Sequence, residues 1–244
     1  MLLLVGTGVN NDITIGALEE LKRCEKVYAE VYTNPMIREF LPQLEKMIGK
    51  RITELQRDKV ESSFLITEAI NKRIALVVGG DPLTATTHIV FVSECRKRNI
   101  PVKVIHNSSI YSVAPARAGL QIYRFGKTAT LVNPRENYNP TSSLDIIREN
   151  LSRNLHTLVL LDTEPQPMKI EIALEKLSEF ERAVVLSRVA SEDETITYGN
   201  IKELLKHAKD LGEPPFTIII PAKLHIVEEE YLEWYKLKKE EKNE

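Results

Sequence analysis

Short runs of Val, Ile and Leu recur along the chain and are separated by more polar stretches. Most of these runs are continuous instead of alternating, which is typical of strands that are buried on both faces. The pattern therefore predicts a sheet-rich protein with central, fully covered strands. The predicted strands are 2–5, 27–31, 75–78, 102–105, 128–132, 157–161, 183–189 and 217–220.

Most of the segments between these runs have the spacing of an amphipathic helix. In the segment 13–23, for example, Ile13, Ala17 and Leu21 recur every four residues and share one face. The segments 142–153 and 168–180 show the same period. Alternating strands and helices predict the α/β class, with mainly parallel sheets.

The number of strands indicates more than one domain. Eight strands are too many for one small doubly wound α/β domain. A segment rich in Ala, with a Pro and a Gly, at 114–120 is a plausible boundary between two domains. We therefore predict two α/β domains, 1–112 and 113–244, with a cofactor cleft between them. The alternative is a single continuous sheet.

Composition narrows the class of protein. The 244 residues carry a formal net charge of -2 and are 43% hydrophobic, so neither a nucleic-acid partner nor an anionic membrane is predicted. No apolar run approaches the roughly 20 residues that span a bilayer. The apolar start MLLLVGTGV is short and lacks a basic flank, so we interpret it as a core strand and not as a signal peptide.

The cysteines give no sign of a metal or disulfide framework. Cys24 and Cys95 lie far apart and have no partner at metal-ligand spacing. Two reduced thiols in a cytoplasmic protein without a metal site are therefore the expectation.

The first candidate ligand loop is VGTGVNND, residues 5–12, where a strand gives way to a helix. Glycines at such a turn allow the backbone to approach a ligand closely. The third glycine of a dinucleotide fingerprint is replaced by Asn11, and the P-loop lysine pattern is absent from the sequence. The loop therefore indicates either a ligand other than a dinucleotide or simply a tight turn.

A second loop, GGDPLTATTH, runs from residue 79 to residue 88 after another buried run. Its glycines permit unusual backbone angles, and Asp81 would lie at the carboxyl end of a parallel strand, where open α/β sheets bind ligands. A carboxylate beside the hydroxyl of Thr84 suits a cationic or hydroxyl-bearing ligand. The alternative is that Asp81 only caps the turn.

Similar polar strand ends follow in both halves. HNSSIYS, residues 106–112, comes after the next strand, and His106 there is either a general base or a structural hydrogen-bonding group. Asp162 ends a strand of the second half, and His225 stands at a predicted helix start. Few nucleophiles occur among these residues, which suits a reaction whose cofactor carries the activated group.

Six segments, taken in order, resemble one known family. They are GTGVNNDITIGALEELKRCEKVYAEVYT, GGDPLTATTH, VIHNSSIYS, GLQIYRFGKTATL, LHTLVLLD and PPFTIIIPAKLHIVEEEYL. Together they resemble the diphthine synthase family, a branch of the tetrapyrrole methylase superfamily, from Leu2 to about Tyr231. The chain departs from the family's pattern at Asn10 and Asn11 and in the segment after Asp162.

The resemblance implies a methyltransferase that uses S-adenosylmethionine, usually as a homodimer. It implies methylation of the amino group of the 3-amino-3-carboxypropyl-histidine of translation elongation factor 2, a step of diphthamide biosynthesis. It assigns no catalytic residue. The cofactor-binding positions carried over from the family are Val9, Asp81, Thr84, Ser109, Ile110, Leu161, Val189 and Phe216.

Two other functions stay open at this point. One is a methyltransferase acting on a tetrapyrrole such as a precorrin or uroporphyrinogen, against which the segments YRFGK and KLHIVE argue. The other is a non-enzymatic nucleotide-binding module, against which the incomplete glycine fingerprint argues. Three basic residues near strand ends are either contacts for the substrate carboxylate or solvated surface: Arg124, Lys127 and Lys223.

Overall fold

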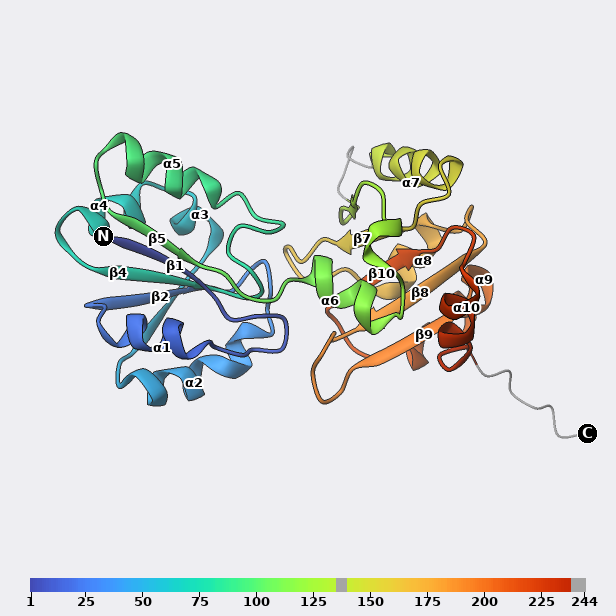
Figure 1. Cartoon of the computed structure of the whole chain (residues 1–244), viewed down its shortest axis with the longest axis horizontal. Helices are drawn as coiled ribbons and strands as arrows, with labels where there is room; N and C mark the ends of the chain where they lie inside the picture. The colour runs from blue at the N-terminus through green and yellow to red at the C-terminus, as the bar shows by residue number, and fades with distance from the viewer. Residues whose placement is uncertain (135–139, 238–244) are drawn as a thin grey trace, which may run out of the picture. The chain divides into compact units, whose positions relative to one another are not determined.

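The computed structural model describes residues 1–134 and 140–237 (Figure 1). The chain folds as two compact units, Met1–Ile110 and Tyr111–Glu244. Each unit contains one five-stranded sheet with helices packed on it, so the predicted α/β class is confirmed. In the described ranges, no helix combines the length and the apolar character needed to cross a membrane.

The sheet of the first unit is entirely parallel, with the strand order β3-β2-β4-β1-β5. Its central strands β1 and β4 are buried along their whole length, which explains their unbroken apolar runs. The bounds are β1 Leu2–Gly6, β2 Lys26–Glu30, β3 Ile52–Leu55, β4 Ile74–Val78 and β5 Val102–Ile105.

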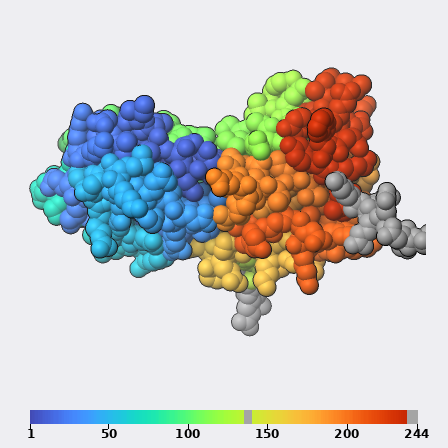
Figure 2. Space-filling model, turned by 90° about the horizontal axis from the view of Figure 1, so that it is seen from below, coloured from blue at the N-terminus to red at the C-terminus, as the bar shows by residue number. Residues whose placement is uncertain are grey.

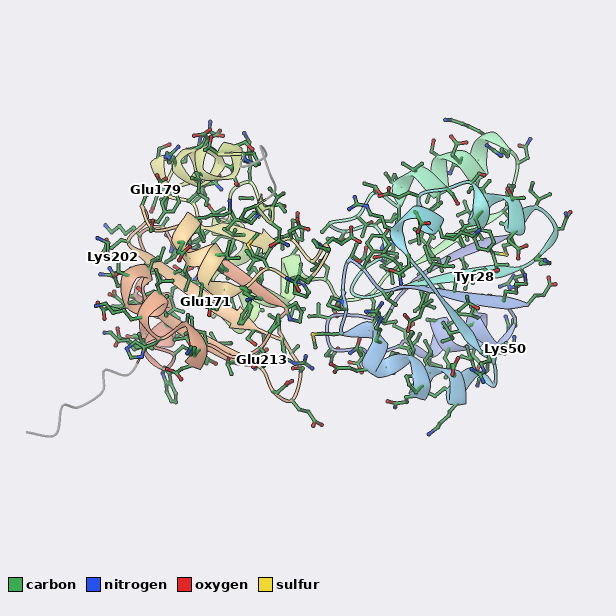
Figure 3. The ribbon with its side chains drawn as sticks, turned by 180° about the vertical axis from the view of Figure 1, so that it is seen from behind. Tyr28, Lys50, Glu171, Glu179, Lys202 and Glu213 are labelled. Carbon is green, nitrogen blue, oxygen red and sulfur yellow. The ribbon has the colours of Figure 1, made fainter. Side chains whose placement is uncertain are left out.

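Both faces of this sheet are covered. Leu2 and Leu4 of β1 belong to one hydrophobic cluster and Leu3 and Val5 to another, as the alternation of side chains along a strand requires. Tyr28, labelled in Figure 3, belongs to the first cluster and packs edge-on against Phe64 of α4. The helices are α1 Ile15–Lys22, α2 Ile37–Ile48, α3 Arg57–Val60, α4 Phe64–Asn71 and α5 Ile89–Lys97.

The two clusters correspond to two helical layers. Helices α1 and α2 cover one face of the first sheet, and α4 and α5 cover the other (Figure 1). In the space-filling view from below, side chains at the blue end of the colour scale form the surface over that first face (Figure 2). The helices cover the faces of the sheet, so the carboxyl ends of its strands are bordered by the loops that follow them.

The sheet of the second unit is mixed, with the strand order β6-β7-β10-β8-β9. Only β6 and β7 pair in parallel, and the other three neighbouring pairs are antiparallel. The second sheet therefore differs from our expectation of mainly parallel strands. The connection 188–194 between β8 and β9 explains part of this difference, because it is too short for a crossover. The strands are β6 Ala129–Leu131, β7 Thr157–Leu161, β8 Arg182–Ser187, β9 Thr195–Asn200 and β10 Phe216–Ile220.

The helices of the second unit begin with α6, the first helix after β5. Two 3-10 turns, η1 and η2, supplement them. The bounds are α6 Ile110–Arg117, η1 Ile122–Arg124, α7 Ser142–Ser152, α8 Ile170–Lys176, α9 Ile201–Lys206, η2 Ala208–Asp210 and α10 Ile226–Glu233.

Candidate functional site

Three loops meet at the carboxyl edge of the first sheet, because β1 lies between β4 and β5. Gly8 and Gly80 exchange two backbone hydrogen bonds, of 3.1 and 2.8 Å, which join the loop after β1 to the loop after β4. The amide of Asn107, which follows β5, donates to the carbonyl of Gly6 at 3.1 Å. All three loops are thus held together by direct hydrogen bonds.

Glycine is required where these loops come closest. A Cβ on Gly6 would lie 2.5 Å from the carbonyl oxygen of Gly80 and 3.0 Å from Cδ of Pro82. Gly80 itself has a φ of +78°, and the nearest atom to a Cβ there would be the carbonyl oxygen of Ser108, at 3.9 Å. The backbone at Gly80 therefore borders open space, where a ligand can approach it closely.

We expect the Gly6→Ala variant to lose about 1–3 kcal/mol of unfolding free energy, because the added methyl group overlaps the backbone of Gly80. Gly16→Ala is the matched control, since Gly16 lies in α1 and a Cβ there would meet nothing within 4 Å. Helix propensity predicts that this control is more stable than the wild type by up to about 1 kcal/mol. Urea unfolding of both variants measures the difference, and equal stabilities would contradict the close packing at Gly6.

Asp81 is the buried centre of the loop after β4, with 7% of its surface exposed. Its Oδ1 accepts hydrogen bonds from the Leu83 N–H at 2.9 Å and from the Thr84 hydroxyl at 3.1 Å. Its Oδ2 lies 2.7 Å from Nδ1 of His106 and accepts from the Asn107 N–H at 3.3 Å. A carboxylate offers about four acceptor positions, so these partners use its full capacity.

These contacts keep Asp81 ionised. Burial raises the pKa of its carboxyl group, but the hydrogen bonds from Leu83, His106, Thr84 and Asn107 outweigh burial and hold the pKa below its ordinary value. Within this unit Asp81 therefore acts as a cap of the turn, which is one of the two roles predicted from the sequence. Direct contact between Asp81 and a cofactor stays a prediction.

A second carboxylate, which is not among the predicted residues, contacts the loop after β4 through His88. Glu30 at the end of β2 is fully buried, and its Oε2 is 2.9 Å from Nε2 of His88, the N-cap residue of α5. Nδ1 of His88 is 3.1 Å from the carbonyl oxygen of Pro82. The contacts of His88 with Glu30 and with Pro82 therefore connect the loop after β4 to the end of β2. A charged residue at the end of a buried strand was the available signal.

The other predicted positions of the first unit lie on the same loops. Val9 is buried, and its N–H donates to the Ser108 hydroxyl at 3.1 Å. Thr84 is held by Asp81, and Ser109 and Ile110 stand at the start of α6. The structure thus brings the predicted residues of this unit to one edge of its sheet.

In the second unit, the three predicted positions also share one sheet edge. Thr217 of β10 pairs with Leu160 of β7, which places Phe216 beside the end of β7 at Leu161. Phe216 also pairs with Ser187, the last residue of β8, and Val189 follows two residues later. Val189 and Phe216 are both buried.

The remaining candidates of the second unit make structural contacts. Asp162 accepts hydrogen bonds from the N–H groups of Asn133 and Glu164, both at 3.1 Å, and so holds a turn. His225 is the N-cap of α10. Lys127 pairs with Glu149 at 2.9 Å in an exposed position.

Arg124 is neither solvated surface nor free for a substrate carboxylate in this arrangement. Its guanidinium pairs with the fully buried Glu228 and donates to the carbonyl of Lys223 at 2.5 Å. Arg124 therefore joins η1 to the segment that precedes α10. The two segments YRFGK and KLHIVE, which are about a hundred residues apart in the sequence, are in direct contact through this pair.

At the edge of the first sheet, the site offers backbone groups beside glycine, small hydroxyls and one buried carboxylate. Such a set can hold a polar small molecule by many directed hydrogen bonds. It supplies positioning more than covalent chemistry, which suits a ligand that itself carries the activated group.

Comparison with known proteins agrees with the resemblance predicted from the sequence. Residues 1–205 match the family described as Tetrapyrrole (Corrin/Porphyrin) Methylases. The diphthine synthase of Methanocaldococcus jannaschii is 40% identical, over 96% of this chain and 98% of the relative. That of Methanococcus vannielii is 38% identical over the same shares. A crystal structure of diphthine synthase superposes with a TM-score of 0.88 and 33% identity, over 96% of this chain and 95% of that one.

Proposed function

Since the chain belongs to the tetrapyrrole (corrin/porphyrin) methylases, we propose that it is an S-adenosylmethionine-dependent methyltransferase that forms diphthine. It methylates the amino group of the 3-amino-3-carboxypropyl-histidine of translation elongation factor 2, within diphthamide biosynthesis. The observation that carries this proposal is the similarity to relatives named diphthine synthase over 96% of the chain, because it extends across both units.

The first unit supplies a suitable place for the cofactor. S-adenosylmethionine, when bound, provides a methyl group on a sulfonium, whose departure leaves a neutral thioether. The open space beside Gly80 accepts a ligand close to the backbone, and Asp81 fixes the loop that borders this space. We assign cofactor contacts to this loop and to the start of α6: Val9, Asp81, Thr84, Ser109 and Ile110.

The second unit contributes the other proposed cofactor positions, Leu161, Val189 and Phe216. They lie at one edge of the second sheet and present apolar side chains, which suit an adenine ring or the carbon chain of the cofactor. This part of the assignment rests on the family resemblance. Substitution of Phe216 tests it through cofactor affinity.

The proposed partners follow from the same function. The protein substrate is elongation factor 2, and the active form is a homodimer. We place the protein in the cytoplasm, because both cysteines are free, as is typical of a reducing compartment.

The test is a transfer assay with labelled S-adenosylmethionine and elongation factor 2 carrying the 3-amino-3-carboxypropyl group. We expect the label on the amino nitrogen, located by mass spectrometry of the modified peptide. Elongation factor 2 with an unmodified histidine is the matched control and should remain unlabelled. Labelling of uroporphyrinogen or a precorrin instead of the protein would favour the tetrapyrrole alternative and contradict the proposal.

A further inference from the structure

His106 differs in its exposure from His88, the other histidine of the first unit. It follows β5 directly, and 65% of its side chain is exposed, whereas only 3% of the His88 side chain is exposed. Its Nδ1 nevertheless contacts the buried carboxylate of Asp81 at 2.7 Å. The Nδ1 side of the ring is therefore held by Asp81, while most of the side chain is exposed to solvent.

This contact determines which nitrogen carries the proton. Asp81 is ionised, since its hydrogen bonds hold the pKa of its carboxyl below the ordinary value, and an ionised carboxylate only accepts hydrogen bonds. Nδ1 of His106 must therefore donate its proton to Oδ2 of Asp81. In the neutral ring the lone pair then lies on Nε2, the opposite nitrogen.

Asn107 and Ser108, the next residues along the chain, are uncharged, and the loop Gly6–Gly8 that packs against them carries no ionisable group. The loop after β1 also brings Asp12 to this segment, since its backbone carbonyl accepts a hydrogen bond from the Asn107 amide at 3.2 Å. Among the described residues, Asp81 is the ionisable side chain found in contact with the His106 ring. The imidazole is thus an oriented base at the loop edge where we place the cofactor.

We propose that His106 is the general base of the methyl transfer, with Nε2 removing a proton from the acceptor ammonium. This inference rests on the proposed function and assigns a role within the same site. Asp81 is then a positioning residue that fixes the tautomer and the orientation of the ring, and it stabilises the imidazolium that forms.

The step is balanced as follows. Nε2 takes one proton from the ammonium, and the nitrogen lone pair that is released forms a bond to the methyl carbon. The bond between that carbon and sulfur breaks, and its electron pair stays on sulfur as a neutral thioether. The exposed imidazolium returns its proton to solvent, so the same residue can act again if a further methyl group is added.

Asp81 and His88 are poorer candidates for this role. The acceptor positions of Asp81 are occupied by its four hydrogen-bond partners. His88 is buried, with Nε2 2.9 Å from Glu30 and Nδ1 3.1 Å from the carbonyl oxygen of Pro82. Neither side chain can take up a substrate proton without breaking contacts that hold the loop.

The magnitude of the effect follows from the acceptor amine. An α-amino group has a pKa of about 8, so roughly a tenth of it is already neutral at pH 7. We therefore expect His106→Gln to lower kcat by about 3- to 10-fold at pH 7, below the range of about 100- to 10,000-fold that is typical of general-base catalysis. The deficit should shrink above about pH 9, where the amine is largely neutral without help.

The experiment compares wild type, His106→Gln, His106→Ala and the control His207→Gln on the modified elongation factor. His207 is a histidine of the second unit whose ring is 3.7 Å from Asp210, and its replacement should leave kcat unchanged. We expect an unchanged affinity for S-adenosylhomocysteine in the His106 variants, a kcat deficit that closes at high pH, and partial rescue of His106→Ala by added imidazole.

Two results would overturn this assignment alone: wild-type kcat for His106→Gln at pH 7, or an equal deficit at every pH without rescue, which indicates a structural role. If the wild-type protein itself transfers no methyl group to the amine, the proposed function fails first and the assignment of His106 fails with it. Circular dichroism confirms that each variant is folded before its rate is interpreted.

Discussion

Replacing Glu228 by Ala should lower the free energy of unfolding by about 3–5 kcal/mol, the range found when one partner of a buried ion pair is removed. Glu228 is fully buried. It accepts hydrogen bonds from the N–H groups of Gln121 at 3.1 Å and of His225 at 2.8 Å, and it pairs with Arg124. Its removal leaves the guanidinium of Arg124 without its ionic partner and two backbone donors without their acceptor.

His156 completes this network. Burial lowers the pKa of its imidazole, and the positive charge of Arg124 lowers it further despite the nearby Glu228, so the ring is neutral. Nδ1 of His156 accepts from the Ala222 N–H at 2.9 Å, which leaves Nε2 as the donor toward Glu228, 3.4 Å away. The network thus links η1, the residue before β7 and the start of α10.

Urea unfolding followed by circular dichroism measures this loss. Glu230→Ala is the matched control, because Glu230 lies in the same helix but is exposed, and it should change stability by no more than about 0.5 kcal/mol. A loss of less than about 1 kcal/mol for Glu228→Ala would show that the network contributes little net stability.

The pH dependence provides a second readout for Glu228. Burial raises the pKa of its carboxyl group, but hydrogen bonds from the His225 and Gln121 N–H groups and the positive charge of Arg124 hold the pKa below its ordinary value. A carboxyl group with a lowered folded-state pKa stabilises the fold above its unfolded pKa of about 4.3, and this contribution is lost as the pH falls through the folded value. The difference between wild type and Glu228→Ala should therefore narrow below about pH 4.

The second large effect concerns Asp81. We expect Asp81→Ala to weaken binding of S-adenosylhomocysteine by about 10- to 100-fold, since each buried donor left unsatisfied costs about 1–3 kcal/mol and loosens the loop that borders Gly80. The N–H groups of Leu83 and Asn107 are the donors that lose their partner. The unit should stay folded, because both hydrophobic clusters of the first sheet are untouched.

Isothermal titration calorimetry measures this affinity. Asp58→Ala, at an exposed acidic position in α3, is the control and should bind like the wild type. Asp81→Asn keeps the size of the side chain but adds an N–H₂ group where Asp81 only accepts, so it should bind more weakly than wild type as well. Unchanged affinity in both Asp81 variants would remove this residue from the proposed cofactor site.

The sequence was sufficient for much of the fold. The eight predicted strands all occur, because strands buried on both faces have continuous apolar runs. The two missed strands, β3 and β9, lie at sheet edges and include partly or fully exposed residues such as Thr53 and Glu54. Their pattern is not that of a buried run. The antiparallel pairing in the second sheet was not predicted, because the amino-acid pattern of a strand does not show whether its neighbouring strands run parallel or antiparallel to it.

The loops of the candidate site were predictable, but their contacts were not. Asp81 follows β4 and His106 follows β5. They meet because both strands lie beside β1 in a parallel sheet, so that their carboxyl ends share one edge. This strand order cannot be read from a single sequence. For the same reason the sequence suggests a substrate contact or solvated surface for Arg124, whereas Glu228 from another segment pairs with it. Residue types at strand ends can be read from the sequence, whereas their partners depend on strand order.

A crystal structure with bound S-adenosylhomocysteine tests the central claim most directly. We predict that the ligand lies against the backbone at Gly80, in contact with the loop that Asp81 organises and with the start of α6. Clear ligand density at any other place on the protein would contradict this account.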